Sequence, residues 1–347
     1  MKEPKRIQLA REIWVGRAVL EKIPEVCQAL DLHGEALIVA DKTTYDIAGR
    51  TVERKLREAG IKPSVSLISD ANSEVVEKVR KSSKGVSFFV GVGGGKSIDV
   101  AKLASFYEGK PFISVPTAAS HDGIASSRAS VRDNGSPVSI QAHAPIAIIA
   151  DTAIIKKAPY RLLASGCGDL VANITAVRDW QLARDFKGEP YSEYAATLSI
   201  VSAELIIANA KVIKRYTEES VRKVVKSLIS SGVAMAIAGS SRPASGSEHL
   251  FSHALDMVAP KPALHGEQCG VGAIMMSYLQ GGDWEIIRNA LKTIGAPTTA
   301  KELGIPPKYI VKALTIAHKI RPERYTVLGG GLGRKEAERL AKITGVI

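Results

Sequence analysis

Residues 86–102 read VSFFVGVGGGKSIDVAK: a short apolar run, three adjacent glycines at positions 93–95, and a segment of helical period. Such an apolar run is typical of a buried strand. Adjacent glycines let backbone N–H groups approach an anion, and a helix that follows offers its positive end. The stretch therefore predicts a strand, a loop and a helix that bind phosphate or pyrophosphate. The alternative is a purely structural turn.

Two standard phosphate-binding sequence motifs do not match this loop. A P-loop ending in Gly95, Lys96 and Ser97 requires its first glycine at the position of Val90, and the dinucleotide pattern that begins at Gly91 requires glycine where Lys96 stands. The anion site is thus predicted from the glycines and the helix start alone.

The surrounding sequence extends the strand and helix pattern in both directions. Apolar runs at 35–41, 64–69, 111–116 and 145–151 alternate with helical segments, whereas long Ala-rich helical segments such as 192–216 and 219–239 follow. This alternation predicts an α/β domain with a parallel, Rossmann-like sheet over residues 1–157. An all-α domain is predicted over residues 158–347.

Composition and charge narrow the classes of partner. The 347 residues carry a formal net charge of +12, but basic and acidic residues are interspersed and aromatics make up only 5%. This pattern favours attraction of small anions over a nucleic-acid groove. The chain opens without an apolar segment, so we expect a cytoplasmic protein without stable membrane insertion.

Three of the seven histidines fall within a short region. His249 and His253 would share one face of a helix, and His265 precedes a glycine and an apolar helix start. Asp169 follows Gly-Cys-Gly and is expected to open a helix, where it is either an N-cap or a carboxylate ligand. Two histidines and one carboxylate are the ligands of many catalytic zinc sites. The three scattered cysteines are interpreted as buried and reduced.

Five segments together resemble the superfamily of glycerol dehydrogenases, iron-type alcohol dehydrogenases and dehydroquinate synthases. They are GGGKSIDVAK (93–102), PTAASHDGIASSRASV (116–131), GCGDLVAN (166–173), EHLFSHALD (248–256) and LHGEQCGVG (264–272). Within the superfamily, the second segment is most similar to the sn-glycerol-1-phosphate dehydrogenases.

The resemblance implies roles for matching residues. Asp169, His249 and His265 would bind Zn²⁺, Asp122 and His253 would be catalytic, and substrate would meet Asp122, Asp169 and His253. Asp41 would lie at an adenosine ribose, where an acid favours NAD(H), although both NAD(H) and NADP(H) remain open. The cofactor would contact Gly95, Lys96, Ser97, Ile98, Asp99, Thr117, Ala118, Ala119, Ser120 and Ser126.

The implied activity is reduction of dihydroxyacetone phosphate to sn-glycerol 1-phosphate for archaeal-type membrane phospholipids. Glycerol dehydrogenase activity on the unphosphorylated compounds is the nearest alternative, followed by dehydroquinate synthase and by a non-catalytic nucleotide- or nucleic-acid-binding protein. Apolar faces in the helical half make a homo-oligomer plausible.

Overall fold

The computed structural model describes residues 7–133 and 136–347. By its internal contacts the chain divides into two compact units: residues 1–119 with 123–159, and residues 120–122 with 160–347. None of the described helices combines the length and apolar character needed to cross a bilayer.

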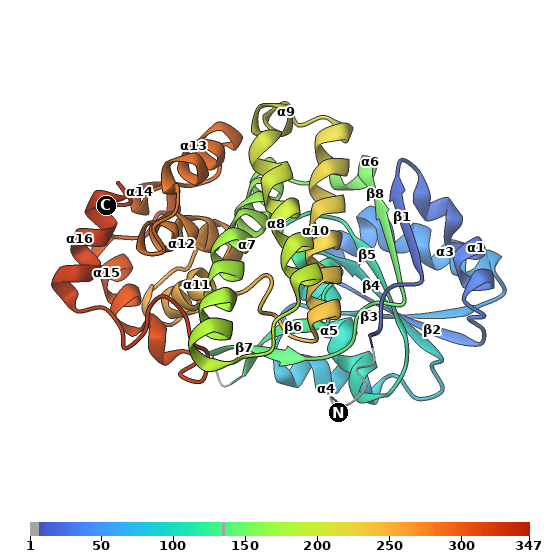
Figure 1. Cartoon of the computed structure of the whole chain (residues 1–347). Helices are drawn as coiled ribbons and strands as arrows, with labels where there is room; N and C mark the ends of the chain where they lie inside the picture. Colours follow the sequence, from blue (N-terminus) through green and yellow to red (C-terminus); the bar gives the residue numbers. More distant parts are fainter. Residues whose placement is uncertain (1–6, 134–135) are drawn as a thin grey trace. The chain divides into compact units, whose positions relative to one another are not determined.

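The first unit is built on a parallel six-stranded sheet of order β1-β8-β5-β4-β2-β3 (Figure 1). The four interior strands β8, β5, β4 and β2 are almost wholly buried, as expected for a sheet covered on both faces. The strands are β1 (Glu12–Gly16), β2 (Glu35–Ala40), β3 (Lys62–Leu67), β4 (Phe88–Gly93), β5 (Phe112–Pro116) and β8 (Ala147–Asp151).

Helices connect these strands. An apolar core of α1, α3 and the inward side chains of the sheet includes Val52, Ile38 and Val90, and α4 packs against α5. The helices are α1 (Ile23–Ala29), α2 (Lys42–Thr44), α3 (Arg50–Glu58), α4 (Ser73–Lys81), α5 (Gly95–Tyr107) and α6 (Thr152–Ile155), with 3-10 turns η1 (Val19–Lys22) and η3 (Asp122–Ile124) and a π-turn η2 (Tyr45–Gly49).

The strand order creates a switch point between β2 and β4. The chain goes from β2 outward to β3, and then from β4 in the opposite direction to β5 and β8. In open α/β sheets, ligands bind beyond the carboxyl ends of the strands at such a point. The residues that follow β2 and β4 are Asp41 and Gly94.

The predicted parallel sheet is confirmed, but three strands were not anticipated. The short edge strand β1 is only partly buried, so its sequence lacks a continuous apolar run. The antiparallel pair β6 (Arg128–Asp133) and β7 (Ser136–Gln141) is rich in polar residues and stands apart from the main sheet. Such strands carry little hydrophobic signal.

The second unit is helical, as predicted. Thr217 and Ser220 form a capping box at the start of α10, and Gly239 ends that helix in the left-handed conformation. The helices are α7 (Tyr160–Lys187), α8 (Glu193–Ala208), α9 (Ala210–Lys214), α10 (Glu218–Ala238), α11 (Ser247–Val258), α12 (His265–Leu279), α13 (Trp284–Ile294), α14 (Ala300–Leu303), α15 (Pro307–Ile316) and α16 (Arg334–Ile343), with the 3-10 turn η4 (Ala317–Lys319).

Candidate metal centre and cofactor site

Asp169 lies in the middle of α7, not at a helix start. The helix start that the sequence predicted at Asp169 is wrong, because the helix runs unbroken from Tyr160 to Lys187. Its glycines serve helix packing instead. A Cβ on Gly168 would lie 2.2 Å from the carbonyl oxygen of Gly266, and one on Gly266 would lie 2.0 Å from that of Ser165. The missing side chains let α7 and α12 touch backbone to backbone.

The two histidines predicted to bind metal belong to α11 and α12. His249 lies in the first turn of α11, and His265 is the first residue of α12, as the sequence predicted. A Cβ on Gly272 would come within 3.0 Å of the Glu248 carbonyl oxygen. Close packing through glycine therefore also fixes α12 against α11.

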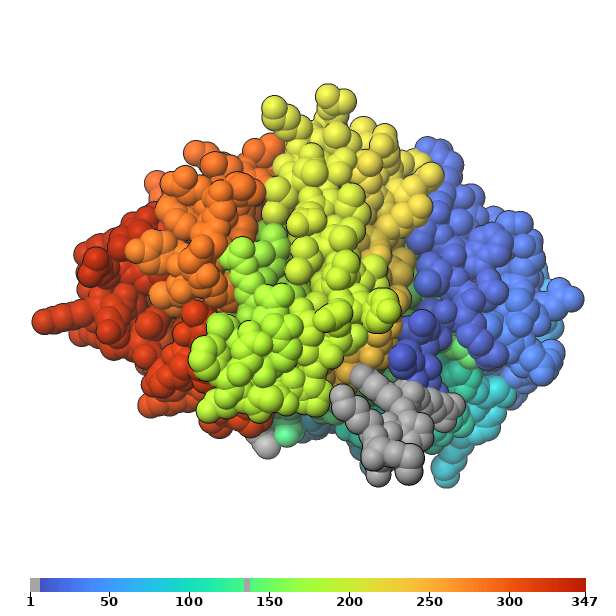
Figure 2. Space-filling model, in the orientation of Figure 1, coloured from blue at the N-terminus to red at the C-terminus, as the bar shows by residue number. Residues whose placement is uncertain are grey.

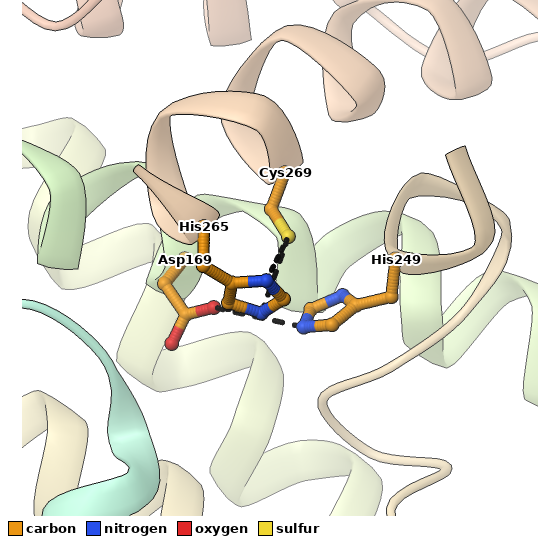
Figure 3. A group of neighbouring side chains, drawn as sticks. All are labelled: Asp169, His249, His265 and Cys269. Atoms are coloured by element: carbon orange, nitrogen blue, oxygen red, sulfur yellow. Dashed lines mark hydrogen bonds and ion pairs between the residues drawn. The ribbon is translucent and has the colours of Figure 1, made fainter. Parts of the chain in front are cut away.

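Four side chains from these three helices form a compact cluster (Figure 3). Asp169, His249, His265 and Cys269 each offer one ligand atom, and these atoms all lie within 4.8 Å of one another. The Nε2 atoms of His249 and His265 lie 3.6 and 3.7 Å from Asp169 Oδ1, and Cys269 Sγ lies 3.5 Å from His265 Nε2.

The three spacings of 3.5, 3.6 and 3.7 Å suit a tetrahedral zinc ion. With bonds of about 2.0–2.3 Å, the donor atoms around such an ion lie roughly 3.3–3.7 Å apart. Carboxylate, imidazole and thiolate are all ordinary zinc ligands. The donor set and its spacing therefore fit the predicted metal.

Cys269 is the residue that sequence reasoning missed. All three cysteines are buried, as expected, but Cys269 is not inert packing, because its sulfur reaches the histidine cluster. The available signal was its position four residues after His265 in a predicted helix, which places both on one face.

Glu248 orients His249 from outside the cluster. This fully buried carboxylate accepts hydrogen bonds from the Gly246 backbone N–H (2.6 Å) and the Thr175 hydroxyl (2.7 Å). It also lies 2.9 Å from His249 Nδ1. A proton on Nδ1 leaves Nε2 as a free electron-pair donor toward the cluster, the usual arrangement for a histidine that binds metal.

Charge interactions within the cluster outweigh burial. Burial alone would raise the pKa of Asp169, but the neighbouring histidines lower that pKa to about 2. Burial alone would lower the pKa of His265, but Cys269 and Asp169 raise it to about 9. Burial would likewise raise the pKa of Cys269, but His249 and His265 lower it. The cluster thus favours anionic oxygen and sulfur donors.

Asp122 adjoins this cluster through its backbone. Its N–H donates to Asp169 Oδ2 at 2.9 Å, and its own Oδ2 accepts from the Ser231 hydroxyl at 2.9 Å. Burial, and then the charge of Asp169, raises the pKa of Asp122 to about 7. Asp122 is therefore held beside Asp169, and its carboxyl group has a pKa near neutrality.

His253 lies one turn beyond His249 on α11, outside the four-ligand cluster. Its ring centroid is 5.8 Å from that of His265, and its Nδ1 has no hydrogen-bond partner among the described residues. Burial lowers the pKa of His253 to about 4. The imidazole is therefore neutral at physiological pH, near the cluster but not part of it.

The loop from Gly93 to Ser97 lies beyond β4 in the first unit. Gly93 has a φ of +148°, and a Cβ there would meet Ser97 and Thr44. A Cβ on Gly94 would meet nothing within 4 Å, so the backbone ahead of α5 faces open space. The buried Ser97 hydroxyl has no hydrogen-bond partner among the described residues. These features suit an anionic group at the start of α5.

Other predicted cofactor residues differ in their surroundings. Thr117, Ala118 and Ala119 follow β5, where the Thr117 N–H donates to the Gly93 carbonyl, so both loops lie at one edge of the sheet. Asp99 is engaged within the protein, because it pairs with buried Lys102 and accepts from the Ser130 N–H.

The structure also places the remaining residues that were predicted to contact the cofactor. The Ser126 hydroxyl donates to the Arg128 carbonyl, and Ile98 is buried within α5, whereas Lys96 is exposed. Ser120 belongs to the second unit. Asp41, after β2, caps α2 by accepting from the Thr44 N–H.

Comparison with known proteins finds one matching family and several relatives that share one name. Residues 14–159 match the family of iron-containing alcohol dehydrogenases. The chain is 59% identical, over 99% of its length and 97% of the relative, to a protein of Methanosarcina acetivorans named glycerol-1-phosphate dehydrogenase (NAD(P)+). A protein of the same name from Methanothermobacter thermautotrophicus is 58% identical, over 99% of this chain and 100% of the relative. Another from Thermococcus kodakarensis is 56% identical, over 98% of this chain and 98% of the relative.

Solved structures of low sequence identity share the fold. Glycerol dehydrogenase from Schizosaccharomyces pombe aligns with a TM-score of 0.81 at 20% identity, covering 99% of this chain and 91% of that one. Sulfoacetaldehyde reductase from Bifidobacterium kashiwanohense aligns with a TM-score of 0.76 at 16% identity, covering 99% of each chain. The two-unit arrangement of sheet followed by helices is thus a known fold.

Proposed function

The chain belongs to the glycerol-1-phosphate dehydrogenase family, and from this premise we propose that it reduces dihydroxyacetone phosphate to sn-glycerol 1-phosphate with NADH or NADPH. Identity of 55–59% over nearly the whole chain carries the proposal. We place the reaction in the cytoplasm, where reduced nicotinamide is available, and assign its product to archaeal-type membrane lipids.

Asp169, His249 and His265 are proposed to hold the zinc ion in the all-α domain that the sequence predicts over residues 158–347. When bound, zinc polarises a carbonyl oxygen as a Lewis acid. Glu248 and Ser252 orient the two imidazoles through their Nδ1 atoms, so that both Nε2 atoms face Asp169. The predicted loss of zinc in Asp169→Ala, His249→Ala and His265→Ala is checked by elemental analysis. Stoichiometric zinc in all three would refute the assignment.

The cofactor is proposed to bind the α/β domain that the sequence predicts over residues 1–157, where it supplies hydride. The backbone from Gly93 to Ser97 would receive its pyrophosphate, with Asp41 at the adenosine ribose beyond the neighbouring strand. We expect Gly94→Val to weaken NADH and NADPH binding, because its side chain would fill the open space ahead of α5. Fluorescence titration measures this. An unchanged dissociation constant, or ATP hydrolysis by the parent protein, would count against the site.

Asp122 and His253 are proposed to contact the substrate. Because the pKa of Asp122 is near 7, its carboxyl group can hold the proton that the developing alkoxide requires. His253 has a pKa of about 4 and is neutral, so it donates a hydrogen bond without carrying a spare proton. Asp122 is accordingly the stronger candidate for proton donor.

A substrate comparison tests the proposed activity. A site built for a phosphate leaves its cations unpaired with an unphosphorylated analogue, which can cost a factor of roughly 10⁴ in kcat/KM. We therefore expect dihydroxyacetone phosphate to be strongly preferred over dihydroxyacetone, and the product to be the sn-1 enantiomer in enantiomer-specific coupled assays. Equal turnover of the unphosphorylated ketone would indicate a glycerol dehydrogenase, and an sn-3 product would refute the stereochemistry.

We also propose that the protein self-associates through α8. Tyr194, Val201 and Leu205 are 85%, 43% and 51% exposed and recur at heptad-like spacing along one side of the helix. The yellow-green part of the surface in Figure 2 includes this helix. Leu205→Glu should lower the mass measured by sedimentation equilibrium, whereas Glu204→Gln on the same helix should not. An unchanged mass in Leu205→Glu would exclude this surface.

A further inference from the structure

The chemical surroundings of Cys269 differ from those of the other two cysteines. Cys27 lies in the apolar core of the first unit, and Cys167 is buried in α7 outside the four-ligand cluster. Cys269 is buried too, but its sulfur lies 3.5 Å from His265 Nε2 and within 4.8 Å of the donor atoms of Asp169 and His249. It is the one cysteine of this chain placed among ligating groups.

The backbone holds this sulfur in place. His265 and Cys269 are one turn apart on α12, and the glycines at 266 and 270 press that part of the helix against α7. The sulfur is therefore directed at the cluster by two packed helices. The spacing between Sγ and Nε2 is also that expected for two neighbouring ligands of one tetrahedral zinc ion.

We propose that the thiolate of Cys269 is a fourth protein ligand of the metal and that it favours zinc over ferrous iron. Two histidines and one carboxylate alone form a set that also suits ferrous iron, whereas a thiolate shifts preference toward softer metals such as zinc. On binding, the S–H bond breaks, a sulfur–metal bond forms and the proton passes to solvent. Catalytic zinc sometimes expands to five ligands, and such an expansion would let a substrate oxygen bind beside four protein ligands.

This inference rests on the metal site of the proposed function, but its test does not depend on catalysis. The chain has three cysteines, so Cys27→Ser/Cys167→Ser leaves Cys269 as the sole thiol. Metal-free protein of this background is loaded with one equivalent of cobalt(II). A thiolate ligand should give an intense sulfur-to-cobalt charge-transfer band in the near ultraviolet.

The matched variant adds Cys269→Ser to the same background. We expect it to bind cobalt without the charge-transfer band, and to lose roughly tenfold or more in zinc affinity by chelator competition, with a smaller loss for ferrous iron. Stoichiometric cobalt binding without the band in the parent background would overturn the proposal, as would a band that persists after Cys269→Ser.

X-ray absorption on the zinc-loaded protein without any substitution avoids a folding defect at all three cysteines. A sulfur neighbour at about 2.3 Å from zinc is expected. A shell of nitrogen and oxygen alone would refute the thiolate ligand. Dihydroxyacetone phosphate turnover by the same protein separates the two hypotheses, because activity without a sulfur neighbour would preserve the proposed function.

Discussion

Glu248 sets the chemistry of His249 without being a ligand itself. Its carboxylate lies at the Nδ1 atom and is held in turn by the Gly246 N–H and the Thr175 hydroxyl. A fixed Nδ1 proton places the electron pair on Nε2, where the metal is proposed to bind. The metal affinity of the proposed site should therefore depend on Glu248, which directly precedes the proposed ligand His249.

We expect Glu248→Gln to weaken zinc binding by about 10- to 100-fold, because an amide cannot satisfy all three donors and loses the negative charge. Zinc affinity is measured by chelator competition, with the His249 tautomer followed by nitrogen NMR. Asp151→Asn is the control, since this buried carboxylate caps α6 in the other unit. Equal affinity in Glu248→Gln and the parent would contradict the role.

His253 should make the metal-free protein sensitive to acid. Burial lowers its folded-state pKa from 6.5 to about 4. The unfolded state therefore binds a proton first, and stability is lost as pH falls from 6.5 toward 4, by up to about 3 kcal/mol. Urea unfolding with a chelator present should show this loss in the parent, relative to its stability above pH 6.5. The loss should be smaller in His253→Gln, and parallel profiles would refute this assignment.

Residue types alone predicted part of the candidate site but not all of it. Asp169, His249 and His265 stood out because acidic and imidazole side chains interrupt apolar, glycine-rich segments, and the structure brings these three together. Cys269 was missed because buried cysteines are common in any core, although its position four residues after His265 places both on one helical face. The role of Glu248 depends on the Thr175 contact, and no local pattern predicts a pairing between residues 73 positions apart.

At the scale of elements, the contact between α7 and α12 determines where the ligands meet. Glycines at 166 and 168 suggested a turn, because glycine weakens isolated helices. Tertiary packing reversed that preference, since only residues without a side chain allow these two backbones to approach. Buried strands were predicted well by their apolar runs, whereas β1, β6 and β7 lacked that signal.

Gly168→Ala should therefore destabilise the protein despite alanine's better helix propensity. Its Cβ would fall 2.2 Å from the Gly266 carbonyl oxygen, so the helices must separate, at a cost of about 3 kcal/mol. Zinc affinity should fall with it. Gly94→Ala is the control, because its Cβ meets no atom and should change stability by less than about 0.5 kcal/mol. Chemical unfolding compares the two, and equal stability would refute the packing argument.

The charge of the whole molecule bears on how fast substrate arrives. A net charge of +12 attracts a dianionic substrate at long range. Added salt screens this attraction. We expect kcat/KM for dihydroxyacetone phosphate to fall about threefold or more as ionic strength rises from about 0.01 to 0.15 M, at constant pH. Neutral dihydroxyacetone is the internal control. If both substrates respond alike, general charge attraction is not the cause.

The proposed ligands lie between residues 169 and 269, on three separate helices, so the site exists only in the folded chain. Bound metal is therefore a crosslink that favours the native state. At a free concentration 100 times its dissociation constant it would add about 2.7 kcal/mol to the free energy of unfolding. The heat tolerance of the protein then becomes a function of metal supply, and metal starvation would reduce the amount of enzyme as well as its activity.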